Sequence, residues 1–258
     1  MALLEVKNCS IAFGGLKALS GLDFNLDAQE LMGIIGPNGA GKTTFFNLLT
    51  GVYDPTEGEI FFEGSLINPL MPHQINRLGV ARTFQNIRLF PELSVLDNVR
   101  VAFHHRIGYS LWDAVLARRR FAEEEEQIRL QALRLLEGFH LGKMKDEQAK
   151  NLSYGDQRRL EMVRALATHP KLLLLDEPAA GMNASEKREL IQLIRRLHGE
   201  LKLAIILIEH DMSVVMNLCP RILVLDYGIP IAEGRPEEIR SNPKVIEAYL
   251  GERVERSV

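Results

Sequence analysis

Residues 31–49 read "LMGIIGPNGAGKTTFFNLL", and this stretch decides the fold that we expect for the chain. Its apolar start indicates a buried strand, its glycine-rich middle indicates a tight turn, and residues 42–50 are typical of a helix. The turn matches the pattern G-x-x-x-x-G-K-[ST], with the strand and the helix that this pattern requires on either side. Such a turn points several backbone N–H groups into one concavity at a helix N-terminus, where phosphate binds. The predicted phosphate-binding positions are Gly36, Asn38, Gly39, Ala40, Gly41, Lys42, Thr43 and Thr44.

A pair of adjacent carboxylates follows a second buried strand. The run "LLLLDEP", residues 172–178, places Asp176 and Glu177 at the end of that strand, where open α/β sheets present their ligands. We expect Lys42 to reach the β- and γ-phosphates of a nucleotide, and Thr43 and Asp176 to hold Mg²⁺. Glu177 is the expected general base, because a carboxylate beside the metal-binding Asp176 can polarise an attacking water.

Apolar runs alternate with helical patterns along the rest of the chain. Three later runs are apolar almost without interruption, as parallel strands covered on both faces require, at residues 171–178, 203–211 and 221–228. Helical patterns fall at residues 184–199 and 211–218. An antiparallel patch is indicated by three early runs, at residues 3–7, 21–27 and 59–64. We therefore predict an α/β fold, with a P-loop NTPase core of mostly parallel sheet, an antiparallel β patch and an inserted α-helical sub-domain.

The inserted sub-domain is expected at residues 87–168, because residues 92–168 show no strand pattern. The helical pattern within it carries one apolar stripe, formed by Ile128, Ala132, Leu135, Leu136 and Phe139. The charged run "RRRFAEEEE", residues 118–126, is expected to be a solvated helix face. The chain is thus predicted to be a single domain, residues 1–258, whose core comprises residues 1–86 and 169–258.

Composition excludes several classes of protein. The chain has 258 residues, a net charge of -3 and 25% charged residues, and this composition does not suggest a basic surface for nucleic acid. Its 2 cysteines, Cys9 and Cys219, lie far apart, which fits a reducing compartment and excludes a disulfide scaffold. The first ten residues do not form a secretory signal, and the apolar runs are too short to span a bilayer. We expect no direct membrane insertion, so a partner must hold the chain at a membrane if it works there.

With its motifs in this order, the chain resembles the ATP-binding cassette family over nearly its whole length. The turn "LSYGDQ", residues 152–157, stands where that family has its LSGGQ-like sequence. In the family two cassettes pair head to tail, and each ATP lies between the phosphate-binding turn of one and this turn of the other. The spacing Ser153-x-x-Asp156 is typical of a capping box, so we expect a helix to start here. The resemblance implies that Ser153 and Gly155 contact the γ-phosphate, although Tyr154 and Asp156 depart from the family's usual residues.

Four further positions take expected roles from the resemblance. Phe13 would stack on adenine, with a core phenylalanine as the alternative. Gln85, in "ARTFQ", would reach the metal and the nucleophilic water, and it lies at the join with the helical sub-domain. His210, in "LIEHD", would contact the γ-phosphate, although a lone histidine is usually structural. Residues 179–183, "AAGMN", would touch the opposite cassette, and Asn183 stands where many members have Asp.

Several stretches are similar to the larger ATP-binding subunit of the high-affinity branched-chain amino acid importer. They are "RTFQNIRLF", "DEPAAGMN", "LIEHDM" and "NPKVIEAYLGE". This resemblance implies that ATP hydrolysis by the chain powers uptake of leucine, isoleucine and valine. It also implies that the chain is peripheral at the cytoplasmic face of the bacterial inner membrane. The implied partners are a sister cassette, identical or not, two transmembrane permease subunits and, indirectly, a periplasmic amino-acid-binding protein.

Other functions stay open at this point. Within the family, the chain could serve a urea or short-chain amide importer or a lipopolysaccharide exporter. Outside transport, it could be a soluble cassette ATPase of DNA repair or translation. Such proteins usually carry tandem cassettes, coiled-coil inserts or basic extensions, and the sequence has none of these. A non-hydrolysing nucleotide-binding regulator is disfavoured because both Lys42 and Glu177 are present.

Overall fold

The computed structural model describes residues 2–104, 108, 110, 113, 116 and 119–255. These residues fall into two compact units, one comprising residues 1–85 and 171–258 and the other comprising residues 86–170. The first unit carries both sheets, and the second is built from helices. In the described part of the chain, no helix combines the length and the apolar composition needed to cross a bilayer.

The larger sheet of the first unit has six strands in the order β10-β9-β3-β8-β7-β6. Four of its strand pairs are parallel, and β10 pairs antiparallel with β9 at one edge. Every residue of β3, β7 and β8 is buried, as their continuous apolar runs predicted. The strands are β3 (Leu31–Ile35), β6 (Val80–Arg82), β7 (Leu172–Asp176), β8 (Ala204–Ile208), β9 (Arg221–Asp226) and β10 (Ile229–Gly234).

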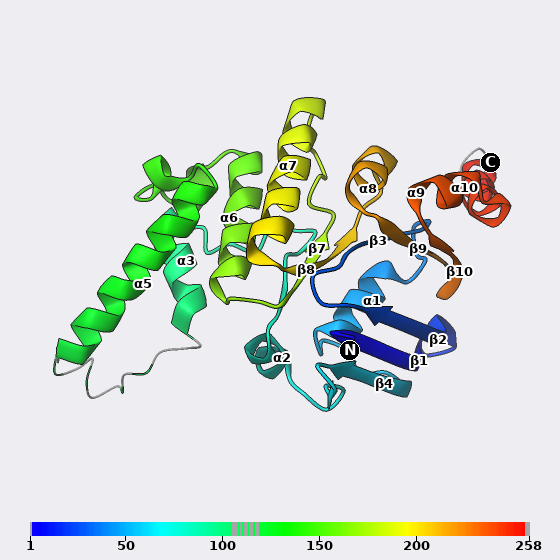
Figure 1. The fold of residues 1–258 in the computed structure, drawn as a ribbon, viewed down its shortest axis with the longest axis horizontal. Helices are drawn as coiled ribbons and strands as arrows, with labels where there is room; N and C mark the ends of the chain where they lie inside the picture. The colour runs from blue at the N-terminus through cyan, green and yellow to red at the C-terminus, as the bar shows by residue number, and fades with distance from the viewer. Residues whose placement is uncertain are drawn as a thin grey trace. The chain divides into compact units, whose positions relative to one another are not determined.

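The predicted antiparallel patch is a second sheet, with four strands in the order β2-β1-β4-β5. Its strands are β1 (Leu4–Phe13), β2 (Leu16–Leu26), β4 (Glu57–Phe62) and β5 (Ser65–Leu66). The helix α1 (Lys42–Leu49) lies between the two sheets (Figure 1). Phe45 and Phe46 of α1 belong to a core cluster that also contains Phe24 of β2 and Ile206 of β8. This shared core fixes the helix that follows the glycine-rich turn against both sheets.

The remaining elements of the first unit agree with the predicted helices and add others. They are α2 (Pro72–Leu78), α7 (Ala184–Leu201), α8 (Met212–Leu218), α9 (Pro236–Ser241) and α10 (Pro243–Glu255). The sequence patterns missed β5, β6, β10, α2, α9 and α10. The strand β6 has three residues, too few for any period to show, and β10 contains Pro230, which is tolerated because β10 is an edge strand.

The second unit packs three helices against one another (Figure 1). These helices are α3 (Val95–Phe103), α5 (Arg119–Gly138) and α6 (Tyr154–Ala167), and short 3-10 turns lie at Gly142–Met144 and Ala149–Asn151. Of the predicted apolar stripe, Ala132, Leu136 and Phe139 are buried, whereas Ile128 and Leu135 are half-buried. Part of the expected helix, residues 111, 112, 114, 115, 117 and 118, lies outside the described residues.

The charged run on α5 forms ion pairs one helical turn apart. Arg119 pairs with Glu123 at 2.7 Å and Arg120 pairs with Glu124 at 3.2 Å. Arg119 is 91% exposed, so this part of the run is the solvated face that the sequence predicted.

Both cysteines lie in the core of the first unit. Cys9 is on β1, and Cys219 follows α8. Burial raises the pKa of the Cys9 thiol to about 11 and that of the Cys219 thiol to about 12, because the charged thiolate is disfavoured away from water.

Candidate functional site

The glycine-rich turn joins β3 to α1, and two of its glycines are required by close packing. A Cβ atom at Gly36 would lie 2.0 Å from the Leu225 carbonyl oxygen, and one at Gly41 would lie 2.6 Å from that of Ala18. Gly41 is also the N-cap of α1, with a φ of 97°, and no side chain caps the helix there. The first turn of α1 therefore begins directly at the glycine-rich turn, where the backbone N–H groups of a helix N-terminus can bind an anion.

The side chain of Lys42 is buried inside the turn. Its Nζ donates to the carbonyl oxygens of Gly36 at 2.7 Å and Pro37 at 2.8 Å. The turn thus holds its cation in place by its own backbone, and Thr43 beside it is exposed. An ammonium group at this position adds a charge-assisted donor for a phosphate oxygen.

Asp176 ends β7 with one carboxylate oxygen bonded and the other unpaired. Its Oδ2 accepts a hydrogen bond of 2.7 Å from Arg82, at the end of the adjacent strand β6. Its Oδ1 is buried and has no hydrogen-bond partner among the described residues. Such an oxygen, together with the Thr43 hydroxyl, offers the hard donors that Mg²⁺ prefers.

No group of three or more His, Cys, Asp or Glu side chains in the described part of the chain could hold a metal ion. A site with one carboxylate and one hydroxyl fits Mg²⁺ only when phosphate oxygens supply further ligands, which is how this ion usually binds beside nucleotides. The residues present fit a nucleotide-bound Mg²⁺ rather than a metal held by protein alone.

The three residues predicted to be catalytic are in contact. Glu177 Oε2 accepts a hydrogen bond of 2.9 Å from Gln85 Nε2, and Glu177 Oε1 lies 2.9 Å from His210 Nε2. The side chain of Glu177 is 14% exposed and that of His210 is 40% exposed, so this cluster is open to solvent on the histidine side. Both oxygens of the expected base are therefore oriented by neighbouring side chains.

The backbone of Glu177 adopts a conformation that is costly for a non-glycine residue. Its φ is 49°, in the left-handed region, and its N–H donates to the Ile208 carbonyl at 2.9 Å. Such strained positions collect at functional sites, where the surrounding structure enforces them. Here the turn directs the Glu177 side chain to Gln85 and His210.

The turn at Ser153 starts α6, in the second unit, as predicted, but it is a simple helix cap and not the predicted capping box. Ser153 Oγ accepts from the Asp156 N–H at 3.2 Å and donates to Asp156 Oδ2 at 2.7 Å. The carboxylate of Asp156 thus bonds the serine hydroxyl rather than the serine N–H that a full capping box would use. Gly155 lies in the first turn of the same helix.

Two models of known protein families match this chain. Residues 19–180 match the model of the ABC transporter family, and residues 230–255 match a model described as "Branched-chain amino acid ATP-binding cassette transporter". The chain belongs to the ABC transporter family. As an ATP-binding cassette of that family, it is an ATPase whose activity is coupled to transport.

Relatives of this ABC cassette match it almost from end to end. It is 46% identical over 250 residues to "High-affinity branched-chain amino acid transport ATP-binding protein LivG" of Escherichia coli (strain K12), covering 97% of this chain and 98% of that protein. It is 44% identical to the corresponding protein BraF of Pseudomonas aeruginosa, with the same two coverages.

Solved structures confirm the fold. The ADP conformation of an ATP-binding cassette of an ABC transporter superimposes with a TM-score of 0.84 at 32% identity, covering 97% of this chain and 99% of that one. A cassette solved as a dimer in a post-hydrolysis state, bound to ADP and Pi, gives a TM-score of 0.76 at 26% identity, with coverages of 90% and 98%.

The contacts of Phe13 and Asn183, two positions with roles expected from the family, are defined in this ABC cassette. Phe13 is 46% exposed and packs edge-on against Tyr53, with ring centroids 5.1 Å apart, so the alternative of a core phenylalanine is wrong. Asn183 caps α7, accepting from the N–H groups of Ser185 at 2.8 Å and Glu186 at 3.1 Å. The side-chain oxygen of Asn183 is therefore engaged within its own chain.

Tyr154, which departs from the family's usual residue, is bound by Arg158 of the same helix. Its hydroxyl accepts from Arg158 at 2.8 Å, and the Arg158 guanidinium lies 5.3 Å from its ring centroid. Arg158 is itself buried and pairs with Glu161 at 3.3 Å. Tyr154 thus occupies the glycine position of the family's turn by anchoring to the next turn of α6.

Two carboxylates beside His210 were not predicted. Glu209 is 3% exposed and accepts from the Ala179 N–H at 2.6 Å, and burial is the main cause that raises its pKa. Asp211 caps α8 and bonds Lys187 at 2.5 Å, and this partner lowers the pKa of Asp211 to about 2. The run "LIEHD" gave the signal, since it places a carboxylate on each side of the histidine.

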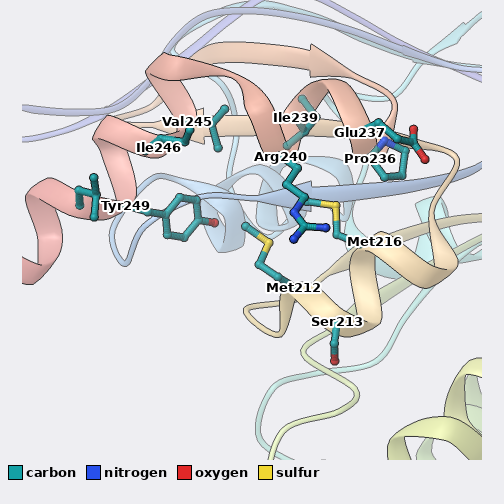
Figure 2. Close-up of a pocket in the computed structure, with 11 residues that line it drawn as sticks. Met212, Ser213, Met216, Pro236, Glu237, Ile239, Arg240, Val245, Ile246 and Tyr249 are labelled. Atoms are coloured by element: carbon teal, nitrogen blue, oxygen red, sulfur yellow. The ribbon is translucent and has the colours of Figure 1, made fainter.

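A cavity of about 880 Å³ lies elsewhere in the first unit, among α8, α9 and α10 (Figure 2). Met212 and Met216 line one wall, and Ile239, Val245 and Tyr249 face them. None of the predicted site residues lines this cavity.

Proposed function

We propose that this ABC cassette hydrolyses ATP, with Mg²⁺, to power uptake of branched-chain amino acids through separate permease subunits. The observation that carries the ATPase site is the placement of Gln85 and His210 on the two oxygens of Glu177. The amino acid substrate is supported by the match of residues 230–255 and by the names of relatives at 46% and 44% identity, which are branched-chain amino acid transport ATP-binding proteins. No described residue would touch the transported molecule, so the substrate rests on this likeness.

The phosphates would bind to the turn at residues 36–44. Backbone N–H groups at the start of α1 would take the negative charge, and Lys42 Nζ would exchange its bonds to Gly36 and Pro37 for phosphate oxygens. Thr43 and Asp176 would hold Mg²⁺, with Gln85 reaching it from the segment that follows β6. When bound, the ion neutralises charge that develops on the β- and γ-phosphate oxygens. Phe13 would stack on the adenine.

Glu177 would act as the general base. It accepts a proton from the attacking water while the water oxygen forms a bond to the γ-phosphorus and the bond to the β–γ bridging oxygen breaks, releasing ADP. The Gln85 amide donates to one carboxylate oxygen and so orients the base. His210 would contact the γ-phosphate from the other side of the carboxylate.

A second cassette would complete the site. Ser153 and Gly155 of one cassette would close over the γ-phosphate bound by its partner, as the family's head-to-tail pairing implies. A related cassette has been solved as a dimer with ADP and Pi, which supports this arrangement. The partners would be an identical or sister cassette, two transmembrane permeases and, indirectly, a periplasmic amino-acid-binding protein. The cassette would be peripheral at the cytoplasmic face of the inner membrane.

The test is uptake by a strain that lacks this chain. We expect its deletion to abolish high-affinity uptake of radiolabelled leucine, isoleucine and valine, with uptake restored by the parental chain and not by Glu177→Gln. Loss of urea or short-chain amide uptake alone, or a defect in lipopolysaccharide export, would instead assign the cassette to one of those transporters. The purified chain alone should be monomeric or weakly dimeric and hydrolyse ATP slowly, because half of each site belongs to a partner.

A further inference from the structure

One short segment of the chain binds the side chains of both Asp176 and Glu177. In the segment of residues 82–85, Arg82 binds the carboxylate of Asp176, and Gln85 binds that of Glu177. Between them, Thr83 Oγ1 accepts from the Asp176 N–H at 3.4 Å. This correspondence arises because β6 and β7 are parallel neighbours, with Arg82 paired to Leu174.

The Arg82 side chain is enclosed together with the carboxylate that it binds. This side chain is 5% exposed and that of Asp176 is 2% exposed. One guanidinium nitrogen lies 2.7 Å from Asp176 Oδ2, and the other lies 2.7 Å from Asn47 Oδ1 on α1. The guanidinium also lies over the rings of Phe46 at 5.4 Å and Phe84 at 5.0 Å. Arg82 therefore joins the helix of the phosphate-binding turn to the expected metal carboxylate.

The contact with Arg82 gives the two carboxylate oxygens of Asp176 different surroundings. The guanidinium occupies Oδ2 and leaves Oδ1, which is buried and unpaired among the described residues. A planar guanidinium can bind two acceptors in fixed directions, which a lysine ammonium does less well. A buried ion pair is a poor source of stability because desolvation offsets its attraction, so packing alone does not explain this pair.

We propose that Arg82 is a positioning residue for Mg²⁺ binding. It fixes Asp176 so that Oδ1 faces the ion, and through Asn47 it sets that oxygen relative to Thr43 on α1. The inference rests on the proposed function, because it assumes that nucleotide and Mg²⁺ bind at Thr43 and Asp176. Groups that orient a metal ligand typically change metal affinity by about 10- to 100-fold when they are removed.

The experiment measures how Mg²⁺ changes the affinity of the full chain for a fluorescent ADP analogue. For Arg82→Gln, we expect the Mg²⁺ concentration at half-effect to rise by about tenfold or more, while the affinity in EDTA stays within about twofold of the parent. Mn²⁺ binding, followed by its electron paramagnetic resonance in the presence of ADP, should weaken by the same factor. Arg100→Gln is the matched control, because it removes an arginine paired with Asp97 and Glu125 in the other unit.

Arg82→Gln leaves Asp176 without its cation and could impair folding, so two further variants are included. Asn47→Ala keeps the ion pair but removes the second anchor, and we expect a smaller shift in the same direction. Arg82→Lys should restore part of the Mg²⁺ affinity, because a cation returns without the second contact.

The outcomes are separable. Equal Mg²⁺ dependence in parent, Arg82→Gln and Asn47→Ala would overturn the inference, as would tighter Mg²⁺ binding, which would make Arg82 a competitor of the ion. If the parent itself showed no Mg²⁺-dependent nucleotide binding, the proposed function would be wrong instead.

Discussion

His210 Nε2 and Glu177 Oε1 lie 2.9 Å apart, although β8 and β7, the strands that precede them, are separated along the chain by the whole of α7. The parallel pairing of the two strands brings Asp176 opposite Ile208, so the residues that follow both strands emerge together. The contact is thus a consequence of sheet register, and it gives the carboxylate a fixed direction.

Removing the charge of the base should separate binding from turnover. Glu177→Gln keeps the shape of the side chain but cannot accept a proton from water, so we expect ATPase activity in the assembled transporter to fall by about 10²- to 10⁴-fold. Nucleotide affinity should stay near the parental value, and ATP should trap a dimer detectable by size-exclusion chromatography. Glu200→Gln, at an exposed position of α7, is the control, and parental turnover by Glu177→Gln would refute the assignment of the base.

Loss of the cation inside the turn should weaken nucleotide binding. Lys42→Ala removes a charge-assisted donor, which contributes about 1.5–3 kcal/mol, so the dissociation constant for ATP should rise by about 10- to 100-fold. Isothermal titration with ATP measures this change, with the exposed Lys244→Ala as control. An unchanged affinity would contradict the phosphate site.

Acid should remove the contribution of the Asp211–Lys187 pair. The pKa of Asp211 is lowered to about 2 by Lys187 and Ser213, so the pair stabilises the fold above the ordinary pKa near 4 and loses its effect as the pH falls toward 2. At pH 6 the free energy of unfolding should exceed that of Asp211→Asn by up to about 2 kcal/mol, and the difference should vanish near pH 2. Asparagine still caps α8, so urea unfolding of the two proteins isolates the charge. A difference that does not depend on pH would count against the ion pair.

The anchor of the altered signature turn should be measurable as stability. Tyr154→Phe keeps the ring over Arg158 but removes the hydroxyl that accepts from this buried guanidinium, so we expect a loss of about 1–2 kcal/mol in the free energy of unfolding. Tyr227→Phe is the control, because Tyr227 is 78% exposed. Equal effects of the two substitutions would mean that the Arg158 contact contributes nothing specific.

Sequence patterns predicted those features of the protein that depend on residues close together in the chain. The strand, glycine turn and helix at residues 31–49 and the continuous apolar strand before Asp176 predicted the α/β fold and the family, and both are confirmed. The cap at Ser153 is equally local, since its donor and acceptor are three residues apart.

The contacts between distant segments could not be predicted in the same way. The Arg82–Asp176 pair depends on the pairing of β6 with β7, and β6 is too short to be seen as a strand. Glu209 binds Ala179 only because β8 lies beside β7. The roles of the site residues stay predictions until the variants above are measured.

The burial of Cys9 and Cys219 bears on how motion in this protein can be followed. With pKa values of about 11 and 12, roughly one Cys9 thiol in ten thousand, and fewer for Cys219, are ionised at pH 7, and both side chains are shielded from reagents. Maleimide dyes should therefore not react with the native thiols. A cysteine introduced on the surface could then carry a fluorophore or spin label without a cysteine-free background, and its signal could be followed when nucleotide is added.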